Sequence, residues 1–386
     1  MTPSDADKPV VVLIGNYPLD RQESMLRFRD MVQANLEAAD ITVVPVAPQG
    51  RIGSLVSRGP LAKWLRYIDK YILFPMGFSR QLAGIKQRFP GRKIIVHICD
   101  HSNAVYARAA RKWFPVLVTC HDLLAVRGAR GEDVDCPASG FGKLLQSAIF
   151  RGLGEATAIA CVSRATQSDI ERLGTPEMAS RSQVIPLALN YAYQPLPREK
   201  AMRLLSQAGI DVPYQGFILH VGSGALRKNR KALPLAVASI KDAWPGQIVF
   251  AGEPLGDDER AVARSQGVDD RIREVKRPGN ETLHALYSVA HALVFMSRSE
   301  GFGWPILEAQ AAGCPVICSN RTSVPEVAGE GALVHEPDDY AAVARDILRL
   351  EDSQVRGQVV ASGFKNVQGY AVERMMASYE NAYRRI

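Results

Sequence analysis

The chain has 386 residues, of which 47% are hydrophobic and 23% charged, which is too long for one hydrophobic core and predicts a globular protein of two domains. No stretch approaches eighteen uninterrupted apolar residues, and the start M-T-P-S-D-A-D-K is too polar for a signal peptide, so the sequence predicts a cytoplasmic protein without a membrane-spanning helix. The six cysteines lack paired C-x-x-C spacing, which argues against a zinc site and favours reduced thiols.

The net charge of +7 is carried by the first half of the chain. Residues 1–190 contain 24 Lys and Arg against 17 Asp and Glu, whereas residues 191–386 contain 23 of each. Within residues 51–93 there is one acidic residue, Asp69, and apolar side chains such as Trp64 and Ile72 recur at nearly helical spacing. The basic residues of this segment are Arg51, Arg58, Lys63, Arg66, Lys70, Arg80, Lys86, Arg88, Arg92 and Lys93.

This segment predicts a basic amphipathic face. Each basic side chain near an anionic leaflet contributes roughly 1 kcal/mol, so the face could hold the protein against the inner side of the cell membrane. A solvated face around an ordinary core helix is the alternative. No nucleic-acid-binding motif accompanies the charge, and we expect no nucleic-acid partner.

Hydrophobic periodicity predicts alternating strands and helices along the first half. Residues 9–15 (P-V-V-V-L-I-G) form a first buried strand, residues 25–39 a helix and residues 41–46 a second strand. Further strands are expected at 93–99 and 115–119, and further helices at 104–112, 143–153 and 165–173. This alternation predicts a Rossmann-like domain.

A proline-rich connection separates the two halves. Residues 186–197 (P-L-A-L-N-Y-A-Y-Q-P-L-P) carry three prolines and no charge, which suits a linker better than the interior of an element. A second series then follows, with strands expected at 217–221, 247–251, 292–296 and 315–318. His220 lies inside the first of these and is predicted to be a core residue.

The segment Ser299–Gly313 (S-E-G-F-G-W-P-I-L-E-A-Q-A-A-G) follows one of these strands. Pro305 suits the first position of a helix that Gly313 would end. In open α/β sheets ligands bind at the carboxyl ends of the strands, and a glycine-rich turn before a helix favours phosphate. Glu300 and Glu308 bracket this turn, which suits a ligand with both phosphates and hydroxyls, such as a nucleotide sugar.

A second glycine-rich segment offers the cations that a diphosphate requires. Cleavage of a sugar–diphosphate bond leaves negative charge on the phosphate oxygen. Arg227 and Lys228 follow Gly222-Ser223-Gly224, whose backbone could approach the phosphates closely. Two preorganised cations can replace a divalent metal, so we expect neither a metal nor a cofactor besides the nucleotide-sugar substrate. A solvated helix start is the alternative interpretation.

These motifs carry a resemblance to a known family. E-G-F-G-W-P-I-L-E, followed by A-G-C-P-V-I-C-S-N and V-P-E-V-A-G, resembles the signature of the retaining glycosyltransferases of family 4, which have the two-domain GT-B fold. H-V-G-S with R-K-N resembles the phosphate-binding loop of that family, T-C-H-D-L its histidine segment and C-V-S-R-A-T its serine turn.

The resemblance implies an α/β protein with two Rossmann-like domains facing across a cleft. Residues 1–190 would bind the acceptor, residues 191–370 the donor, and a helix over residues 371–386 would cross back to the first domain. Glu300 and His121 are implied as catalytic, with Glu300 near the transferred sugar and Glu308 at the ribose hydroxyls. The implied donor-binding residues are Gly15, Gly222, Ser223, Arg227, Lys228, Gly301, Phe302, Gly303 and Glu308.

The resemblance also implies the reaction. Attack on the same face of the sugar, with the leaving phosphate taking the acceptor's proton, would retain the anomeric configuration, since the sequence shows no second carboxylate for a double displacement. The implied donor is a GDP- or UDP-sugar, and similarity to mannosyltransferase-like members of the family favours GDP-mannose. The expected acceptor is a glycan or lipid-linked oligosaccharide of bacterial surface polysaccharide synthesis.

Three other interpretations stay open. A metal-dependent GT-A transferase could use Asp133-Val134-Asp135, a GT-B enzyme could act as a UDP-sugar epimerase or hydrolase, and a non-catalytic subunit could bind a membrane or glycan. The chain departs from the family pattern at Trp304, where a small aliphatic residue is more usual. It also lacks the expected tryptophan-containing stretch at residues 366–370, before the last helix.

Overall fold

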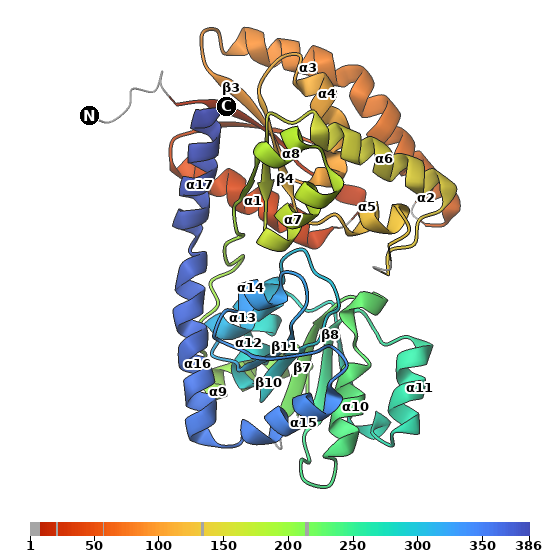
Figure 1. Cartoon of the computed structure of the whole chain (residues 1–386), viewed down its shortest axis with the longest axis vertical. Helices are drawn as coiled ribbons and strands as arrows, with labels where there is room; N and C mark the ends of the chain where they lie inside the picture. The colour runs from red at the N-terminus through yellow and green to blue at the C-terminus, as the bar shows by residue number, and fades with distance from the viewer. Residues whose placement is uncertain (1–7, 21, 57, 133–134, 213–215) are drawn as a thin grey trace, which may run out of the picture. The chain divides into compact units, whose positions relative to one another are not determined.

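The computed structural model describes residues 8–20, 22–56, 58–132, 135–212 and 216–386. The chain divides into an N-terminal unit, residues 1–186 with 373–386, and a C-terminal unit, residues 187–372 (Figure 1). Each unit is built on one parallel six-stranded sheet flanked by helices, which confirms the predicted α/β class.

The sheet of the N-terminal unit has the strand order β2-β1-β3-β4-β5-β6, and all neighbours are parallel. Its strands are β1 (Val10–Ile14), β2 (Thr42–Val46), β3 (Ile94–Ile98), β4 (Val116–Cys120), β5 (Ala158–Cys161) and β6 (Ser182–Val184). β1, β3 and β4 are buried at every residue, as expected of apolar strands covered on both faces. β5 and β6 were not predicted, because β5 (A-I-A-C) consists mainly of small residues and β6 (S-Q-V) is mostly polar, so neither shows an apolar run.

The helices of this unit are α1 (Glu23–Ala38), α2 (Pro60–Ile68), α3 (Phe74–Arg88), α4 (Ala107–Ala110), α5 (Leu124–Ala129), α6 (Gly140–Gly154), α7 (Arg164–Leu173), α8 (Pro176–Ser180) and α17 (Val372–Arg385). The helix predicted at residues 104–112 is wrong in type at its start, where a 3-10 turn over His101–Tyr106 precedes the four-residue α4. Asp100 caps that turn by accepting a hydrogen bond from the Ser102 N–H, which favours the tighter winding.

The basic segment forms one nearly continuous helical run from α2 to α3. The two helices are joined by a π-helical turn over Asp69–Leu73, in which the Phe74 N–H reaches the Asp69 carbonyl. Pro75 explains the turn, because its ring would clash with the carbonyl four residues earlier in a regular α-helix.

The last helix, α17, belongs to the N-terminal unit except for its first residue. Tyr379 and Tyr383 are fully buried and dock it, with the Tyr383 hydroxyl 2.7 Å from His97 Nδ1 and the Tyr379 hydroxyl 3.0 Å from Thr119 Oγ1. Burial lowers the pKa of His97 to about 3, so its ring is neutral. Tyrosines therefore dock this helix in a chain that lacks the tryptophan-containing stretch.

The sheet of the C-terminal unit has the order β12-β11-β10-β7-β8-β9 and is also parallel throughout. Its strands are β7 (Phe217–Gly222), β8 (Gln247–Gly252), β9 (Ile272–Lys276), β10 (Ala292–Phe295), β11 (Val316–Ser319) and β12 (Leu333–His335). This is the Rossmann order, in which the first and fourth strands lie side by side and the connections diverge to opposite edges. The divergence places the loops after β7 and β10 at the topological switch point.

Helices cover both faces of this sheet. They are α9 (Arg198–Gln207), α10 (Ala232–Ser239), α11 (Asp257–Ser265), α12 (Asn280–Val289), α13 (Trp304–Ala311), α14 (Val324–Ala328), α15 (Tyr340–Arg349) and α16 (Ser353–Val367). β9 and β12 were not predicted, since both are edge strands in which most residues are partly buried or exposed. Across the residues that the structure describes, no helix has both the length and the apolarity to cross a bilayer.

Candidate active site

Two loops of the C-terminal unit meet at the switch point of its sheet. The loop after β7 carries Arg227 and Lys228 in a short 3-10 turn, and the loop after β10 carries Glu300. The Arg298 N–H donates a hydrogen bond of 2.7 Å to the Arg227 carbonyl, which ties the loops together. Arg227 and Lys228 are adjacent in the sequence, Glu300 lies 73 residues after Arg227, and the fold brings the three side chains into contact.

Arg227, Lys228 and Glu300 form an ion triad. Lys228 Nζ lies 2.7 Å from Glu300 Oε1, and Arg227 Nη1 lies 3.0 Å from Glu300 Oε2. Burial by itself would raise the pKa of the Glu300 carboxyl, but Lys228 and Arg227 outweigh burial and hold that pKa below its usual value. Glu300 is therefore ionised, and the triad keeps a net positive charge suited to an anionic ligand.

The turn that carries Glu300 has a fixed backbone. Gly303 has φ of 113°, a left-handed conformation that favours glycine, and it precedes the first residue of α13. Ser323 Oγ, fully buried, donates to the carbonyls of Glu300 and Phe302 at 3.0 and 2.9 Å. The Glu300 N–H donates to Thr322 Oγ1 at 2.9 Å. Thr322 and Ser323, which precede the V-P-E motif, therefore hold this turn, a role that sequence analysis missed.

Glu308 lies one turn into α13 and is buried. Its Oε1 accepts a hydrogen bond of 2.8 Å from Asn190 Nδ2, and its Oε2 accepts one of 2.9 Å from the Tyr287 hydroxyl. Asn190 and Tyr287 are separated from Glu308 by 118 and 21 residues, so no local spacing could reveal them. The partners fix the direction of the carboxylate, and its role at a ribose stays a prediction.

Trp304, the departure from the family pattern, lies at the start of α13. Its indole N–H donates a hydrogen bond of 2.9 Å to the Ala188 carbonyl, and the side chain is buried. Phe302, a predicted donor-binding residue, is also buried and contacts Tyr370 edge to face at 5.9 Å. Both aromatic rings thus anchor the turn of Glu300 to distant segments of the same unit.

The glycine-rich loop after β7 lies beside Lys228. A Cβ added at Gly222 would lie 3.6 Å from Lys228 Cε, so Gly222 and Lys228 pack closely. The Gly224 N–H donates a hydrogen bond of 2.8 Å to the Glu253 carboxylate. Ser223 follows β7 directly and is partly exposed. Gly301 lies in the Glu300 turn, between the two carbonyls that Ser323 binds.

His220 is a core residue, as predicted. Its ring stacks on Phe295 with centroids 6.2 Å apart, and Nδ1 lies 3.3 Å from the Val294 carbonyl. Burial, and next the charge of Lys228, lower the pKa of His220 to about 3, so the ring is neutral.

The other two predicted site residues, His121 and Gly15, lie in the N-terminal unit. His121 follows β4, is buried, and makes an edge-to-face contact with Phe28 at 4.9 Å. Its Nε2 lies 2.8 Å from the Cys99 carbonyl, which accepts only, so Nε2 carries the proton and Nδ1 has the lone pair. Burial lowers the pKa of His121 against the opposing effect of Asp100, which favours the neutral ring.

A polar cluster that sequence analysis missed surrounds the ends of β1 and β3. Asp100 accepts hydrogen bonds from Asn16 Nδ2 at 2.5 Å and from the Ser102 N–H at 2.9 Å. Burial favours a raised pKa for Asp100, but the neighbouring His101 and these hydrogen bonds lower it. Gly15 directly follows β1, and a Cβ there would lie 2.5 Å from Arg29 Cδ, so a larger residue would require the Arg29 side chain to shift.

In the described part of the chain, no group of three or more His, Cys, Asp or Glu side chains is arranged as a metal site. Asp133 and Val134 of the D-x-D alternative lie outside the described residues.

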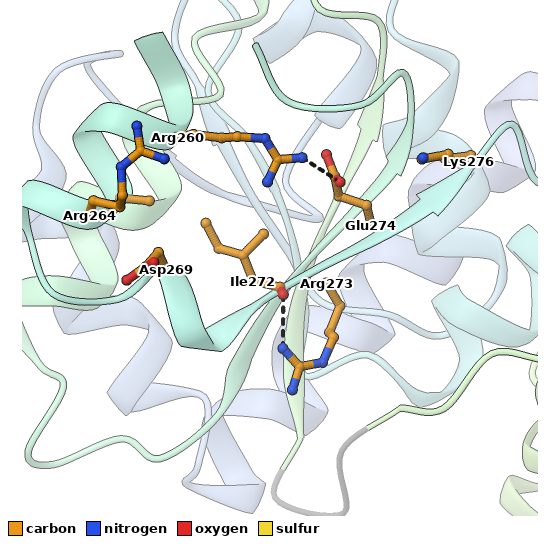
Figure 2. A pocket seen from close by; sticks show the side chains of 8 residues that line it. Arg260, Arg264, Asp269, Ile272, Arg273, Glu274 and Lys276 are labelled. Carbon is orange, nitrogen blue, oxygen red and sulfur yellow. Dashed lines mark hydrogen bonds and ion pairs between the residues drawn. The ribbon is translucent and has the colours of Figure 1, made fainter. Parts of the chain in front are cut away.

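A separate basic pocket of about 390 Å³ lies between α11 and β9. Figure 2 shows Arg260 directed at Glu274, with which it forms an ion pair of 2.7 Å, and Arg264 at the left on the same helix, α11. The residues that line it are Arg260, Ala263, Arg264, Asp269, Ile272, Arg273, Glu274 and Lys276. None is a predicted site residue, so the pocket is not part of the ion triad.

Two family models match the chain. Residues 31–193 match the model described as Glycosyltransferase Family 4, and residues 212–362 match the model described as Glycosyl transferases group 1. The O-antigen chain mannosyltransferase B of Escherichia coli is 31% identical over 248 residues, which cover 63% of this chain and 64% of that protein.

Two further relatives match more of the chain at lower identity. The D-inositol 3-phosphate glycosyltransferase of Mycolicibacterium vanbaalenii is 27% identical, covering 89% of this chain and 79% of that protein. The MMP alpha-(1->4)-mannosyltransferase of Mycolicibacterium hassiacum is 26% identical, covering 84% and 79%.

Solved structures share the fold over nearly the whole chain. Sucrose-phosphate synthase from Thermosynechococcus elongatus has a TM-score of 0.73 at 21% identity and covers 98% of this chain and 99% of its own. HepE of Anabaena, solved in complex with UDP and glucose, has a TM-score of 0.67 at 15% identity and covers 98% and 100%. The likeness confirms the predicted GT-B fold.

Proposed function

Because this chain belongs to glycosyltransferase family 4, we propose that it transfers a hexose, with retention and without a metal, from a nucleotide-diphosphate sugar to a glycan or lipid-linked oligosaccharide. The favoured donor is GDP-mannose, and the favoured setting is surface polysaccharide synthesis at the inner face of the bacterial cell membrane. The names of two relatives, an O-antigen chain mannosyltransferase and an MMP mannosyltransferase, support mannose. Because HepE was solved with UDP, UDP-sugars are included among the donors to be tested.

The ion triad carries the proposal. A diphosphate needs cations that are fixed before it binds, and Lys228 and Arg227 are held by Glu300 at 2.7 and 3.0 Å. When the phosphates arrive, the cations can share their charge between the phosphates and Glu300. The carboxylate then faces the positive charge that develops on the sugar.

The remaining predicted residues take roles that match their chemistry. The backbone of Gly222, Ser223, Gly301, Phe302 and Gly303 lines the donor, and Gly15 approaches the diphosphate. Glu308, whose carboxylate is directed by Asn190 and Tyr287, accepts hydrogen bonds from ribose hydroxyls. His121, neutral and with a lone pair on Nδ1, serves as the second catalytic group by accepting a hydrogen bond from the transferred sugar.

The reaction breaks the bond between the sugar C1 and the diphosphate oxygen. The acceptor hydroxyl oxygen bonds to C1 on the face that the phosphate leaves, and its proton passes to the departing phosphate. Lys228 and Arg227 stabilise the negative charge on that phosphate, and Glu300 stabilises the positive charge on the sugar.

Thermal unfolding with GDP, UDP, ADP and their common sugars, all in EDTA, tests the donor. A ligand at 100 times its dissociation constant adds about 2.7 kcal/mol to the free energy of unfolding. We expect GDP and GDP-mannose to stabilise the protein. Stabilisation should be lost in Lys228→Ala and kept in Lys241→Ala, which removes an exposed lysine of the same unit.

Product analysis tests the transfer itself. With GDP-mannose and a lipid-linked oligosaccharide, the new linkage should have the α configuration of the donor. An inverted linkage, a requirement for manganese, or consumption of the nucleotide sugar at the same rate without acceptor would each contradict the proposal. Stabilisation by UDP-sugars alone would overturn the choice of mannose while leaving the transferase assignment in place.

A further inference from the structure

The N-terminal unit carries an exposed apolar cluster that the ion triad does not use. Six large apolar side chains on α2, the π-helical turn, α3 and α6 are between 44% and 78% exposed. They are Leu61, Trp64, Ile72, Met76, Phe141 and Leu144, which we name the apolar–basic face together with Arg58, Lys63, Arg80 and Lys143. Large exposed apolar patches on folded proteins mark interaction surfaces.

Aromatic contacts join helices α2 and α6 within this face. The Trp64 and Phe141 rings lie 5.3 Å apart, and Tyr67 lies 5.8 Å from Phe141. Figure 1 shows α2 and α6 on the same side of the N-terminal unit. Leu61, Trp64, Ile72 and Met76 follow the helical period along the run, so they share one side of it.

The charge of the face is of one sign. Among the described residues from 58 to 93, the one carboxylate is Asp69, which is buried and bonded to the Tyr17 hydroxyl at 2.7 Å and the Gly53 N–H at 2.8 Å. Residues 137–154, which include α6, contain no Asp or Glu. Exposed Arg58, Lys63, Arg80 and Lys143 therefore meet no acidic side chain from these two segments.

We propose that the apolar–basic face docks on the surface of an anionic lipid bilayer. Apolar side chains with Trp64 among them enter the boundary between headgroups and acyl chains, and the basic side chains bind the lipid phosphates. A second copy of the chain fits less well, because two faces with exposed charge of one sign repel each other. The inference concerns a surface outside the donor site and goes beyond the proposed transfer.

Vesicle sedimentation with the full chain, without nucleotide or acceptor, tests the docking. We expect binding to vesicles of phosphatidylcholine with an equal amount of phosphatidylglycerol, little binding to phosphatidylcholine alone, and loss of binding at high salt. The fluorescence of Trp64 should shift to the blue on binding, and the shift should vanish in Trp64→Phe. Because no donor is present, a failure here leaves the glycosyl transfer untouched.

Two pairs of surface variants locate the binding. Lys63→Glu with Lys143→Glu should weaken vesicle binding by more than about 20-fold, because each basic residue contributes about fivefold at an anionic surface and the new carboxylates are repelled by it. The matched control, Lys200→Glu with Lys365→Glu, reverses two exposed charges of the C-terminal unit and should bind as the wild type does. Leu61→Ser with Met76→Ser should weaken binding by about tenfold or more.

Three results would overturn the proposal. These are equal binding to neutral and anionic vesicles, unchanged binding by both pairs of face variants, and a stable dimer without vesicle binding that Leu61→Ser with Met76→Ser dissociates. The last result would assign the face to a second copy of the chain. Since all four substituted side chains are exposed, unchanged unfolding temperatures should show that the variants fold.

Discussion

The two units place different chemistry at the same point of similar sheets. In the C-terminal unit, the loops after β7 and β10 bring two cations onto one carboxylate, Glu300. In the N-terminal unit, the ends of β1, β3 and β4 bring amides, a hydroxyl and imidazoles around one carboxylate, Asp100.

Under the proposed function, this difference matches the two ends of a nucleotide sugar. Phosphates require fixed cations, whereas sugar hydroxyls are matched by neutral donors and acceptors. One sheet architecture therefore supplies both kinds of site, since the switch point fixes where the loops end and the loop sequences decide the charge.

Glu300→Gln tests the ion triad of the C-terminal unit and should have the largest effect. The amide keeps the shape but removes the charge that faces the sugar, so kcat should fall by roughly 10² to 10³. Nucleotide binding should persist, because Lys228 and Arg227 lose their internal counter-ion and keep their own charges. Initial rates and thermal shifts measure the two effects, and full activity in this variant would remove Glu300 from the chemistry.

His121→Ala tests the N-terminal unit's side of the comparison, the polar cluster around Asp100. If His121 accepts a hydrogen bond during transfer, kcat should fall by about 10². Stabilisation by the nucleotide alone should stay at the wild-type level, since His121 belongs to the N-terminal unit. A variant that transfers normally would show that the imidazole serves only to fill space beside Phe28.

Tyr287→Phe tests whether Glu308 and Glu300, both in the C-terminal unit, have different roles. The change removes the hydrogen bond to Glu308 Oε2 and leaves Asn190 as the partner of Oε1. A misdirected buried carboxylate costs about 1–3 kcal/mol, so nucleotide affinity should fall by about tenfold while kcat changes less. Calorimetry with the donor's nucleotide measures this. An equal loss of kcat with unchanged affinity would place Glu308 at the reacting sugar.

Acid pH should weaken both units by the same mechanism. The pKa values of His97 and His220 are lowered to about 3 by burial, so the unfolded chain takes up protons below pH 6.5 while the folded chain does not. Stability present above pH 6.5 is thus lost progressively as the pH falls toward 3, by about 1.4 kcal/mol per histidine for the first unit of pH.

Urea unfolding at pH 7.5 and 5.5 measures this loss. His97→Gln should flatten the pH dependence of the N-terminal unit, and His220→Gln that of the C-terminal unit. The same slope in both variants and in the wild type would show that other groups carry the acid sensitivity.

The sequence alone predicted the α/β class and most of the buried strands, because apolar runs such as residues 10–14 and 292–295 carry a strong local signal. Its motifs predicted the family. It also selected Arg227, Lys228 and Glu300, since a glycine-rich turn at the end of a buried strand indicates a ligand site. Short β5 and β6 and the edge strands β9 and β12 carry no comparable signal, and their formation depends on the neighbours with which they pair.

Tertiary structure alone decided which side chains meet. Asn190 and Tyr287 reach Glu308, Ser323 holds the turn of Glu300, and Asn16 reaches Asp100 across separations that no motif spans. Likewise, the sequence placed Trp64 on a basic amphipathic helix, but only the packing of α6 beside it joined Phe141 to the same exposed face. Local chemistry fixes what each residue can do, whereas contacts between distant segments depend on how whole elements bury their apolar faces.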